Sequence, residues 1–452
     1  MNKKILNLAI PSIVSNITVP LLGLVDVAIV GHLGAPAYIG AIAVGGMLFN
    51  MIYWMFAFLR MGTSGLTSQA YGRRDLKEAS LLFVRSLGVA AGLGLLLILL
   101  QTLILQGAFL FIHTTDDIRG LATLYFQICI WGAPAMLGLY SFAGWFVGMQ
   151  NSHFPMYIAI MQNVVNIFAS LCFVYLFKMG VAGVAFGTLI AQYAGFLSAL
   201  FLWYVYYRRL WRKVEVREVI EGKALKSFFL LNRDIFFRTL CLVAVTTSFT
   251  SQGAGHGEVI LAVNTLLMQL FTLYSYVMDG FAYAAEALTG RYIGAGNPLG
   301  FKRMLRVLFA WGVVLASLFT LLYAVGGQSF LSLLTDEKKV LEVASGYAYW
   351  AWAIPFAGMA AFLWDGIYIG ATASRQMLYS MMIAAVCFFG VYAALHDTMG
   401  NHALWLAFIL YLFSRGVVQT CLAPGIFNFF QNMIVCITVL FQFLPTYANP
   451  TS

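Results

Sequence analysis

The chain has 452 residues, of which 62% are hydrophobic and only 10% are charged, whereas charged residues make up about 25% of a typical soluble domain. Because one membrane span takes about 20 to 25 apolar residues, this composition excludes the soluble enzyme classes and predicts about a dozen spans. The net charge of +9 comes from 26 Lys and Arg against 17 Asp and Glu; the basic residues lie in short loops between apolar runs, which indicates membrane topology rather than nucleic-acid binding.

Membrane-spanning helices are predicted from the lengths of the apolar runs and from the polar residues that separate them. The first run follows Lys3 and Lys4 as in a signal peptide, but it continues past Asp26 without a small-residue cleavage site, so we expect it to remain as the first span. The predicted spans are 5–31, 38–70, 79–112, 120–149, 155–178, 181–207, 228–252, 257–292, 301–334, 342–371, 375–396 and 402–422. The expected fold class is therefore an all-α polytopic membrane protein with twelve transmembrane helices.

The distribution of basic residues predicts the orientation of these spans, because Lys and Arg concentrate near the cytoplasmic ends. If the N-terminus is cytoplasmic, the opposite side holds only Arg119, Lys178, Lys338 and Lys339. The cytoplasmic side then holds Lys3, Lys4, Arg73, Arg74, Lys77, the charged segment 208–226, Arg291, Lys302, Arg303, Arg306 and Arg375. The sequence therefore predicts a cytoplasmic N-terminus, with the charged segment as a connector at the midpoint.

An internal repeat divides the chain into two similar halves. At an offset of 222 positions, Leu66-Thr67 recurs as Leu288-Thr289, Tyr125 as Tyr347, Gly148 as Gly370 and Ser152 as Ser374. The repeat predicts a six-helix lobe at residues 1–215, a second six-helix lobe at 216–424 and an uncharged apolar tail at 425–452. Six is even, so both copies cross the membrane in the same sense, and we expect a pseudo-two-fold axis along the membrane normal. A cavity between the lobes is the predicted substrate site.

Asp26 lies within an apolar stretch of the first span. The residues on either side of it, 21–25 and 27–30, offer no partner within one helical turn, so burial favours protonation of this carboxylate near neutral pH. The alternative is a carboxylate buried against an arginine of another helix. Pro11 and Pro20 remove backbone hydrogen bonds from the same helix, which allows a bend or produces a static kink.

Other ionisable residues within the spans suggest a second polar region. Asp234 and Arg238 are four residues apart, which predicts an intrahelical ion pair. Asp279 and Glu286 are seven apart and share one helix face, and with Asp365 they form a candidate acidic lining of the second lobe. The alternative for Glu286 is an ion pair with Arg291 or Arg306.

No set of residues with catalytic spacing emerges. The histidines lie at or near loop ends without an HxxxH or HExxH pattern, so neither a metal site nor an intramembrane hydrolase is predicted. The phosphate-binding GK[ST] pattern is absent from the sequence, and no cofactor is expected. Without a nucleotide site, transport by this chain would need an ion gradient.

Several ordered motifs resemble one transporter family. They are Leu24-Val25-Asp26 with Gly31-His32-Leu33-Gly34, Arg60-Met61-Gly62-Thr63, the run 180–185 with Thr188, and the run from Asp279 to Leu288. Over roughly residues 1–420 the chain resembles the DinF-like branch of the multidrug and toxic compound extrusion (MATE) transporters. This resemblance implies two six-helix bundles in a V shape that export organic cations or other amphipathic compounds in exchange for H+ or Na+.

The same resemblance implies roles for particular residues. Asp26 matches the first-helix aspartate that takes up the proton or coupling ion, and Pro11 matches the bend of that helix. Asn166 and Thr188 match its polar partners, and Asp365 matches an acidic position of the tenth helix. Ser170 stands where many members have a second aspartate, a departure that weakens the case for Na+ in the first lobe.

The sequence therefore predicts a monomeric secondary antiporter of the inner (plasma) membrane, in contact with lipids and with small amphipathic or cationic substrates. A flippase for a lipid-linked precursor is the alternative and would need a cationic cavity. A membrane-embedded transferase would need a His or Cys constellation that the sequence lacks. Residues 416–452 contain no Lys, Arg, Asp or Glu, unlike the basic tail common in the family. The stretch 426–444 is open to three interpretations: a thirteenth span, an interfacial segment, or a non-native end.

Overall fold

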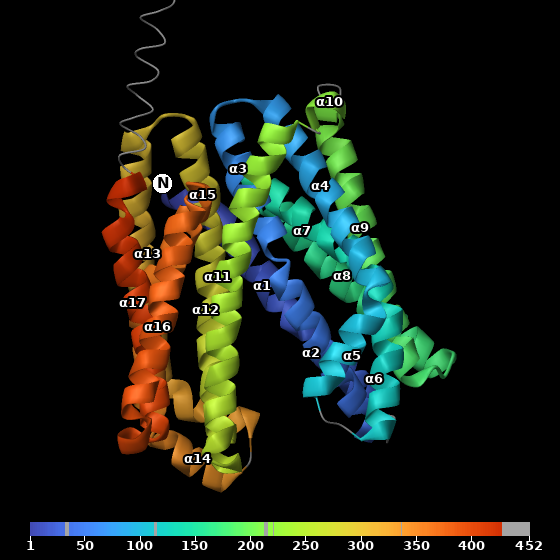
Figure 1. Ribbon diagram of the computed structural model, residues 1–452, viewed down its shortest axis with the longest axis vertical. Coiled ribbons are helices and arrows are strands. Elements are labelled where there is room, and N and C mark those ends of the chain that lie inside the picture. The colour runs from blue at the N-terminus through green and yellow to red at the C-terminus, as the bar shows by residue number, and fades with distance from the viewer. Residues whose placement is uncertain (32–35, 113–114, 212–215, 220, 336, 427–452) are drawn as a thin grey trace, which may run out of the picture.

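The computed structural model describes residues 1–31, 36–112, 115–211, 216–219, 221–335 and 337–426, and within these ranges every regular element is helical (Figure 1). The helices of the first half are α1 (Asn2–Gly31), α2 (Pro36–Met55), α3 (Phe58–Gly72), α4 (Leu76–Leu99), α5 (Gln101–Phe111), α6 (Asp116–Cys129), η1 (Ile130–Gly132), α7 (Ala133–Gly148), α8 (His153–Leu171), η2 (Cys172–Leu176) and α9 (Gly180–Trp211). After α10 (Val216–Val219), the second half contains α11 (Gly222–Gly255), α12 (Glu258–Gly294), α13 (Pro298–Leu334), α14 (Lys338–Ser345), α15 (Ala348–Gly370), α16 (Ser374–Met399) and α17 (Asn401–Leu422).

Each predicted span coincides with a helix or with two consecutive helices, so the all-α polytopic fold is confirmed. Eleven helical segments of the described chain are long and apolar enough to cross a membrane. The remaining predicted span, 228–252, lies in α11, whose 34 residues suffice in length but include Arg233, Asp234 and Arg238. These charges are accommodated because each contacts an oppositely charged side chain of the protein.

The two halves have separate hydrophobic cores. Figure 1 shows α12–α17 on the left and α4–α9 on the right, with α3 and α11 between them toward the end that carries α10; the two halves are further apart toward α6 and α14. Helix α1 contributes to both cores: Ile5 and Leu8 pack with residues of the second half, whereas Ile29 and Val30 pack with residues of the first. The Asp26 end of this helix therefore belongs to the first half, and its beginning is packed on the second.

The backbone repeats its unusual conformations at the offset found in the sequence. Three pairs of residues with positive φ lie 222 positions apart, namely Arg74 (61°) and Gly296 (59°), Gln150 (65°) and Thr372 (54°), and Lys178 (54°) and Gly400 (53°). The caps of the following helices repeat as well, since the Asp75 side chain accepts a hydrogen bond from the Glu78 amide and the Asn297 side chain accepts one from the Gly300 amide. The same turns therefore occur at equivalent places in both halves.

The described part of the charged connector packs on the first half. Arg85 of α4 donates hydrogen bonds to the carbonyl oxygens of Glu218 (2.7 Å) and Val219 (3.1 Å), and Lys77 pairs with the Glu218 carboxylate at 2.7 Å. The sequence expectation for the stretch 426–444 concerns residues that, from 427 on, lie outside the described ranges.

Candidate functional site

A polar cluster surrounds Asp26 in the interior of the first half. Asp26 lies on α1, Asn166 and Ser170 lie on α8, and Thr188 lies on α9. The Thr188 hydroxyl donates a hydrogen bond to Asp26 Oδ2 at 3.3 Å, and Asn166 Nδ2 donates to Thr188 Oγ1 at 3.1 Å. Asp26 is only 4% exposed, and Asn166 and Ser170 are fully buried. The structure thus brings together all four residues that the sequence placed at this site.

The cluster contains buried oxygen atoms without a hydrogen-bond partner. Asn166 and Ser170 lie close enough to the Asp26 carboxylate to interact with it. Even so, Asp26 Oδ1, Asn166 Oδ1 and Ser170 Oγ form no hydrogen bond within the described part of the chain. Buried polar atoms are normally paired, so these three oxygens have unused capacity for a proton or a small cation.

Local sequence explains why the cluster is tight. A Cβ atom at Gly187, one residue before Thr188 on α9, would overlap the Ser170 hydroxyl, so glycine lets α9 approach α8 closely. Helix α1 runs through Pro11 and Pro20, both of which lie inside it. Near the second proline, Asn163 of α8 donates a hydrogen bond to the Thr18 carbonyl at 2.9 Å. The helix that carries Asp26 is therefore held against α8 by polar contacts as well as by packing.

Asp365, the acidic position of the predicted tenth span, is paired with cations. Its carboxylate accepts hydrogen bonds from Arg238 of α11 and from Gln419 Nε2 of α17 (2.6 Å), and Arg415 of α17 lies 3.8 Å away. The Asp365 and Arg415 side chains are buried. The acidic lining expected in the second lobe is thus wrong at this position, because two guanidinium groups compensate one carboxylate.

Glu286 is also paired, but neither of the expected partners is involved. Its Oε2 lies 3.3 Å from Nη1 of Arg60, which belongs to α3 of the first half. Arg291 instead lies over the ring of Tyr71. The expectation was wrong because it considered basic residues close in sequence, whereas α3 and α12 pack side by side and bring Arg60 to Glu286.

Asp279 differs from the other two acidic residues of the second half. It is half-buried and has no hydrogen bond or ion pair within the part of the chain that the structure describes. Arg60 is the cation that acts on it most strongly, ahead of Arg238 and Arg415. Of the predicted acidic lining, Asp279 alone therefore retains an unpaired carboxylate.

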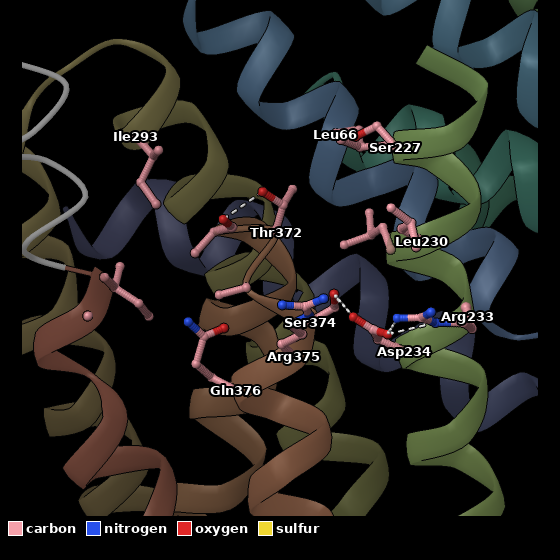
Figure 2. A pocket seen from close by; sticks show the side chains of 15 residues that line it. Leu66, Ser227, Leu230, Arg233, Asp234, Ile293, Thr372, Ser374, Arg375 and Gln376 are labelled. Atoms are coloured by element: carbon pink, nitrogen blue, oxygen red, sulfur yellow. Dashed lines mark hydrogen bonds and ion pairs between the residues drawn. The ribbon is translucent and has the colours of Figure 1, made fainter. Parts of the chain in front are cut away.

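The predicted intrahelical pair of Asp234 and Arg238 is absent. Asp234 Oδ1 lies 2.9 Å from Arg233 Nη2, and Asp234 Oδ2 accepts a hydrogen bond from the Ser374 hydroxyl at 3.0 Å. Figure 2 shows these residues lining a cavity of about 420 Å³ between α11 and the start of α16. Arg238 points to Asp365 instead, and the Asp234 carboxylate is occupied by Arg233 and Ser374.

The acidic residues of the second half were predicted from the sequence, but their cationic partners were not. A signal was present, because the predicted spans contain nine arginines against seven acidic residues, and charges inside a membrane are usually paired. No group of three or more His, Cys, Asp or Glu side chains that could hold a metal ion occurs among the described residues.

The comparisons with known proteins agree with this architecture. The MatE family model matches residues 11–172 and 235–392. DNA damage-inducible protein F of Escherichia coli (strain K12) is 36% identical over 424 residues, which cover 92% of this chain and 90% of that protein. Probable multidrug resistance protein NorM of Thermotoga maritima is 23% identical over 368 residues, which cover 76% of this chain and 74% of that protein.

Among solved structures, the crystal structure of MATE in the bent conformation matches with a TM-score of 0.83 at 19% identity and covers 96% of both chains. At this identity the likeness concerns the fold alone. The family model and the Escherichia coli relative go further, and they show that the chain belongs to the MatE family of multidrug and toxic compound extrusion transporters, in its DinF-like branch.

Proposed function

We propose that this transporter exports amphipathic or cationic small molecules from the cell in exchange for protons, and that Asp26 is the residue that binds the proton. Membership of the family makes the protein a transporter of small molecules rather than an enzyme. The multidrug resistance named for the Thermotoga maritima relative supports drug-like substrates for this chain. The coupling ion and the direction of exchange are our inference.

The observation that carries the proposal is the uncompensated Asp26 carboxylate. Unlike Glu286 and Asp365, it has no Lys or Arg in ion-pair distance within the described residues. A buried charge without a counterion is costly, and this cost is removed when the carboxyl group is protonated. A proton on Asp26 Oδ1 would also supply a hydrogen-bond donor, which the buried amide oxygen of Asn166 lacks.

The composition of the cluster favours H+ over Na+. A sodium ion is a hard cation that prefers several oxygen ligands, and in a low-dielectric site its charge is best compensated by carboxylates. The Thr188 hydroxyl donates its hydrogen to Asp26 and its oxygen accepts from Asn166, which leaves it poorly placed as a ligand. With Ser170 in place of a second aspartate, one carboxylate remains, and one carboxylate is sufficient for a proton.

We place this chemistry in a two-lobe exporter with a cytoplasmic N-terminus, whose lobes are residues 1–215 and 216–424. Binding of the proton and of the substrate must favour different conformations for exchange to occur. The flippase alternative needs a cationic cavity, but Arg60 contacts Glu286, and Arg238 and Arg415 both contact Asp365. Each of these three guanidinium groups has a carboxylate partner, and with the nearby Asp279 carboxylate the positive and negative charges of this region are equal in number, which supports the exporter.

The test is substrate transport by purified protein in proteoliposomes under an imposed pH gradient. Asp26→Asn keeps the shape of the side chain but cannot exchange a proton, so we expect gradient-driven transport to be lost while the protein remains folded. Asp117→Asn is the matched control, because Asp117 is exposed at the start of α6. Proton-driven transport at the wild-type rate in Asp26→Asn would move the coupling to another residue.

A further inference from the structure

The two halves of the protein meet in an interface made of backbone-to-backbone contacts, which we call the central interface. It joins α3 of the first half to α12 and α15 of the second. A Cβ atom at Gly65 would overlap the carbonyl oxygen of Ile369, and one at Gly72 would overlap that of Arg291. From the other side, a Cβ atom at Gly294 would overlap the carbonyl oxygen of Gln69. The helices therefore touch without intervening side chains.

Two glutamine side chains of the first half cross this interface. Gln69 Nε2 donates hydrogen bonds to the Gly370 carbonyl at 3.0 Å and to the Thr372 hydroxyl at 3.1 Å. Gln150 Nε2 donates to the Ala287 carbonyl at 2.7 Å. All three acceptors belong to the second half, so the contact between the halves is polar as well as close.

The ion pair of Arg60 and Glu286 lies within the same interface. The side chains of Arg60 and Glu286 are 10% and 1% exposed, and the Arg60 guanidinium also lies 4.0 Å from the centre of the Tyr283 ring. The other ion pairs of buried arginines in the described chain, Arg85 with Glu78 and both arginines with Asp365, join residues of one half. The pair of Arg60 and Glu286 is thus the buried ion pair that links the halves.

The polar atoms around this pair are incompletely satisfied. The Ser64 hydroxyl lies close enough to the Glu286 carboxylate to interact with it, but Glu286 Oε1, Ser64 Oγ, Thr67 Oγ1 and Thr289 Oγ1 are buried and form no hydrogen bond of normal geometry among the described residues. Ser64 and Glu286 occupy equivalent positions of the repeat, 222 residues apart, as do Thr67 and Thr289. Permanent interfaces rarely bury unpaired polar atoms, whereas an interface that opens to water would hydrate them in its open state.

We infer that Arg60 and Glu286 form a latch that holds the central interface closed in one of the conformations between which the exporter alternates. This inference rests on the proposed function as an exporter that alternates between conformations. A guanidinium left unpaired in the closed interface would be strongly destabilised, because a buried charge that loses its partner keeps its desolvation penalty. Loss of the Glu286 charge should therefore shift the protein toward the open interface. Glu286 is a positioning residue in this scheme and need not touch the substrate.

Opening of the central interface can be measured by cysteine labelling. Ser68 of α3 is fully buried and faces Gly290 of α12 across the central interface. In full-length protein whose six native cysteines are replaced by alanine, Ser68→Cys should therefore react with a bulky maleimide only when the interface opens. In detergent-purified protein, we expect Glu286→Gln to raise the labelling rate by about tenfold or more. Glu78→Gln is the matched control, because it breaks the pair with Arg85 inside the first half and should leave the rate unchanged.

Charge exchange distinguishes a latch from a general loss of structure. The double variant Arg60→Glu with Glu286→Arg restores opposite charges and should return labelling toward the parent rate, with substrate transport recovered in part. If either variant does not yield folded protein by size exclusion and thermal unfolding, Arg60→Gln tests the same pair and should raise labelling as well.

Two outcomes would overturn the latch. One is an unchanged labelling rate in folded Glu286→Gln and Arg60→Gln protein. The other is an equal rise in Glu78→Gln, which would mean that any lost ion pair loosens the fold. Neither labelling result depends on Asp26. If labelling contradicts the latch but Asp26→Asn abolishes proton-driven transport, the proposed function stands without the latch. If labelling supports the latch but Asp26→Asn transports normally, the latch stands and Asp26 is not the coupling residue.

Discussion

Substitution of Asp365 tests directly whether the buried charges of the second half stabilise the fold or take part in ion coupling. The Asp365 carboxylate accepts hydrogen bonds from Arg238 and Gln419, and the Arg415 guanidinium lies 3.8 Å away. Asp365→Asn keeps an oxygen for Gln419 but removes the negative charge that compensates two buried guanidinium groups. Removing one partner of a buried ion pair costs about 3–5 kcal/mol, which for a chain of 452 residues corresponds to a fall in the melting temperature of roughly 3 to 5 °C.

The measurement is thermal unfolding of the purified protein in detergent, followed by proton-driven transport per folded molecule. We expect the melting temperature to fall and the transport of the remaining folded protein to stay within about threefold of wild type. A double-mutant cycle with Arg238→Gln should show a coupling energy above about 1 kcal/mol, because the two residues are in contact. An unchanged melting temperature together with lost transport would refute this reasoning and give Asp365 a coupling role.

Three further predictions follow from the same geometry. Wild-type transport should be indifferent to a Na+ gradient at clamped pH, and Ser170→Asp should introduce Na+-dependent transport or Na+ binding, because it supplies a second carboxylate to the cluster. Gly65→Ala should raise labelling of Ser68→Cys, since the added Cβ meets the Ile369 carbonyl, whereas Gly92→Ala, where no atom lies within 4 Å, should not. Asp279→Asn should weaken binding of a cationic substrate, but not of a neutral one, by about tenfold in an equilibrium binding assay, because this carboxylate is unpaired.

The helices could be predicted from the sequence because each span must satisfy its own backbone hydrogen bonds in lipid and therefore needs a long apolar run. The breaks inside two predicted spans, 38–70 and 79–112, were harder to predict. Helix α2 ends at Met55 and α3 begins at Phe58, and α4 and α5 are separated at Leu100. No glycine or proline marks either break. These interruptions depend on how the helices pack, and the length of an apolar run carries no information on packing.

One part of the candidate site could likewise be predicted from the sequence, and the other part could not. The cluster of Asp26, Asn166, Ser170 and Thr188 was predicted from the resemblance to a family, because its members lie on three helices whose proximity no spacing reveals. The ion pairs of the second half were not predicted, and one predicted pair was wrong. Local rules relate residues three or four positions apart, whereas Arg238 and Asp365 are 127 positions apart and Arg60 and Glu286 are 226 apart.

The contrast between the halves follows from how a membrane protein tolerates a buried carboxylate. Glu286 and Asp365 are paired with arginines from other helices, and such pairs bind helices together. A compensated carboxylate is a poor proton acceptor, since protonation would leave the arginine unpaired. Asp26 has hydroxyl and amide neighbours instead of a cation, so gaining a proton removes an uncompensated charge and breaks no ion pair. Proton exchange and attachment of the halves therefore make opposite demands on a carboxylate, and the chain meets them at separate residues, with α1 packed on both halves between them.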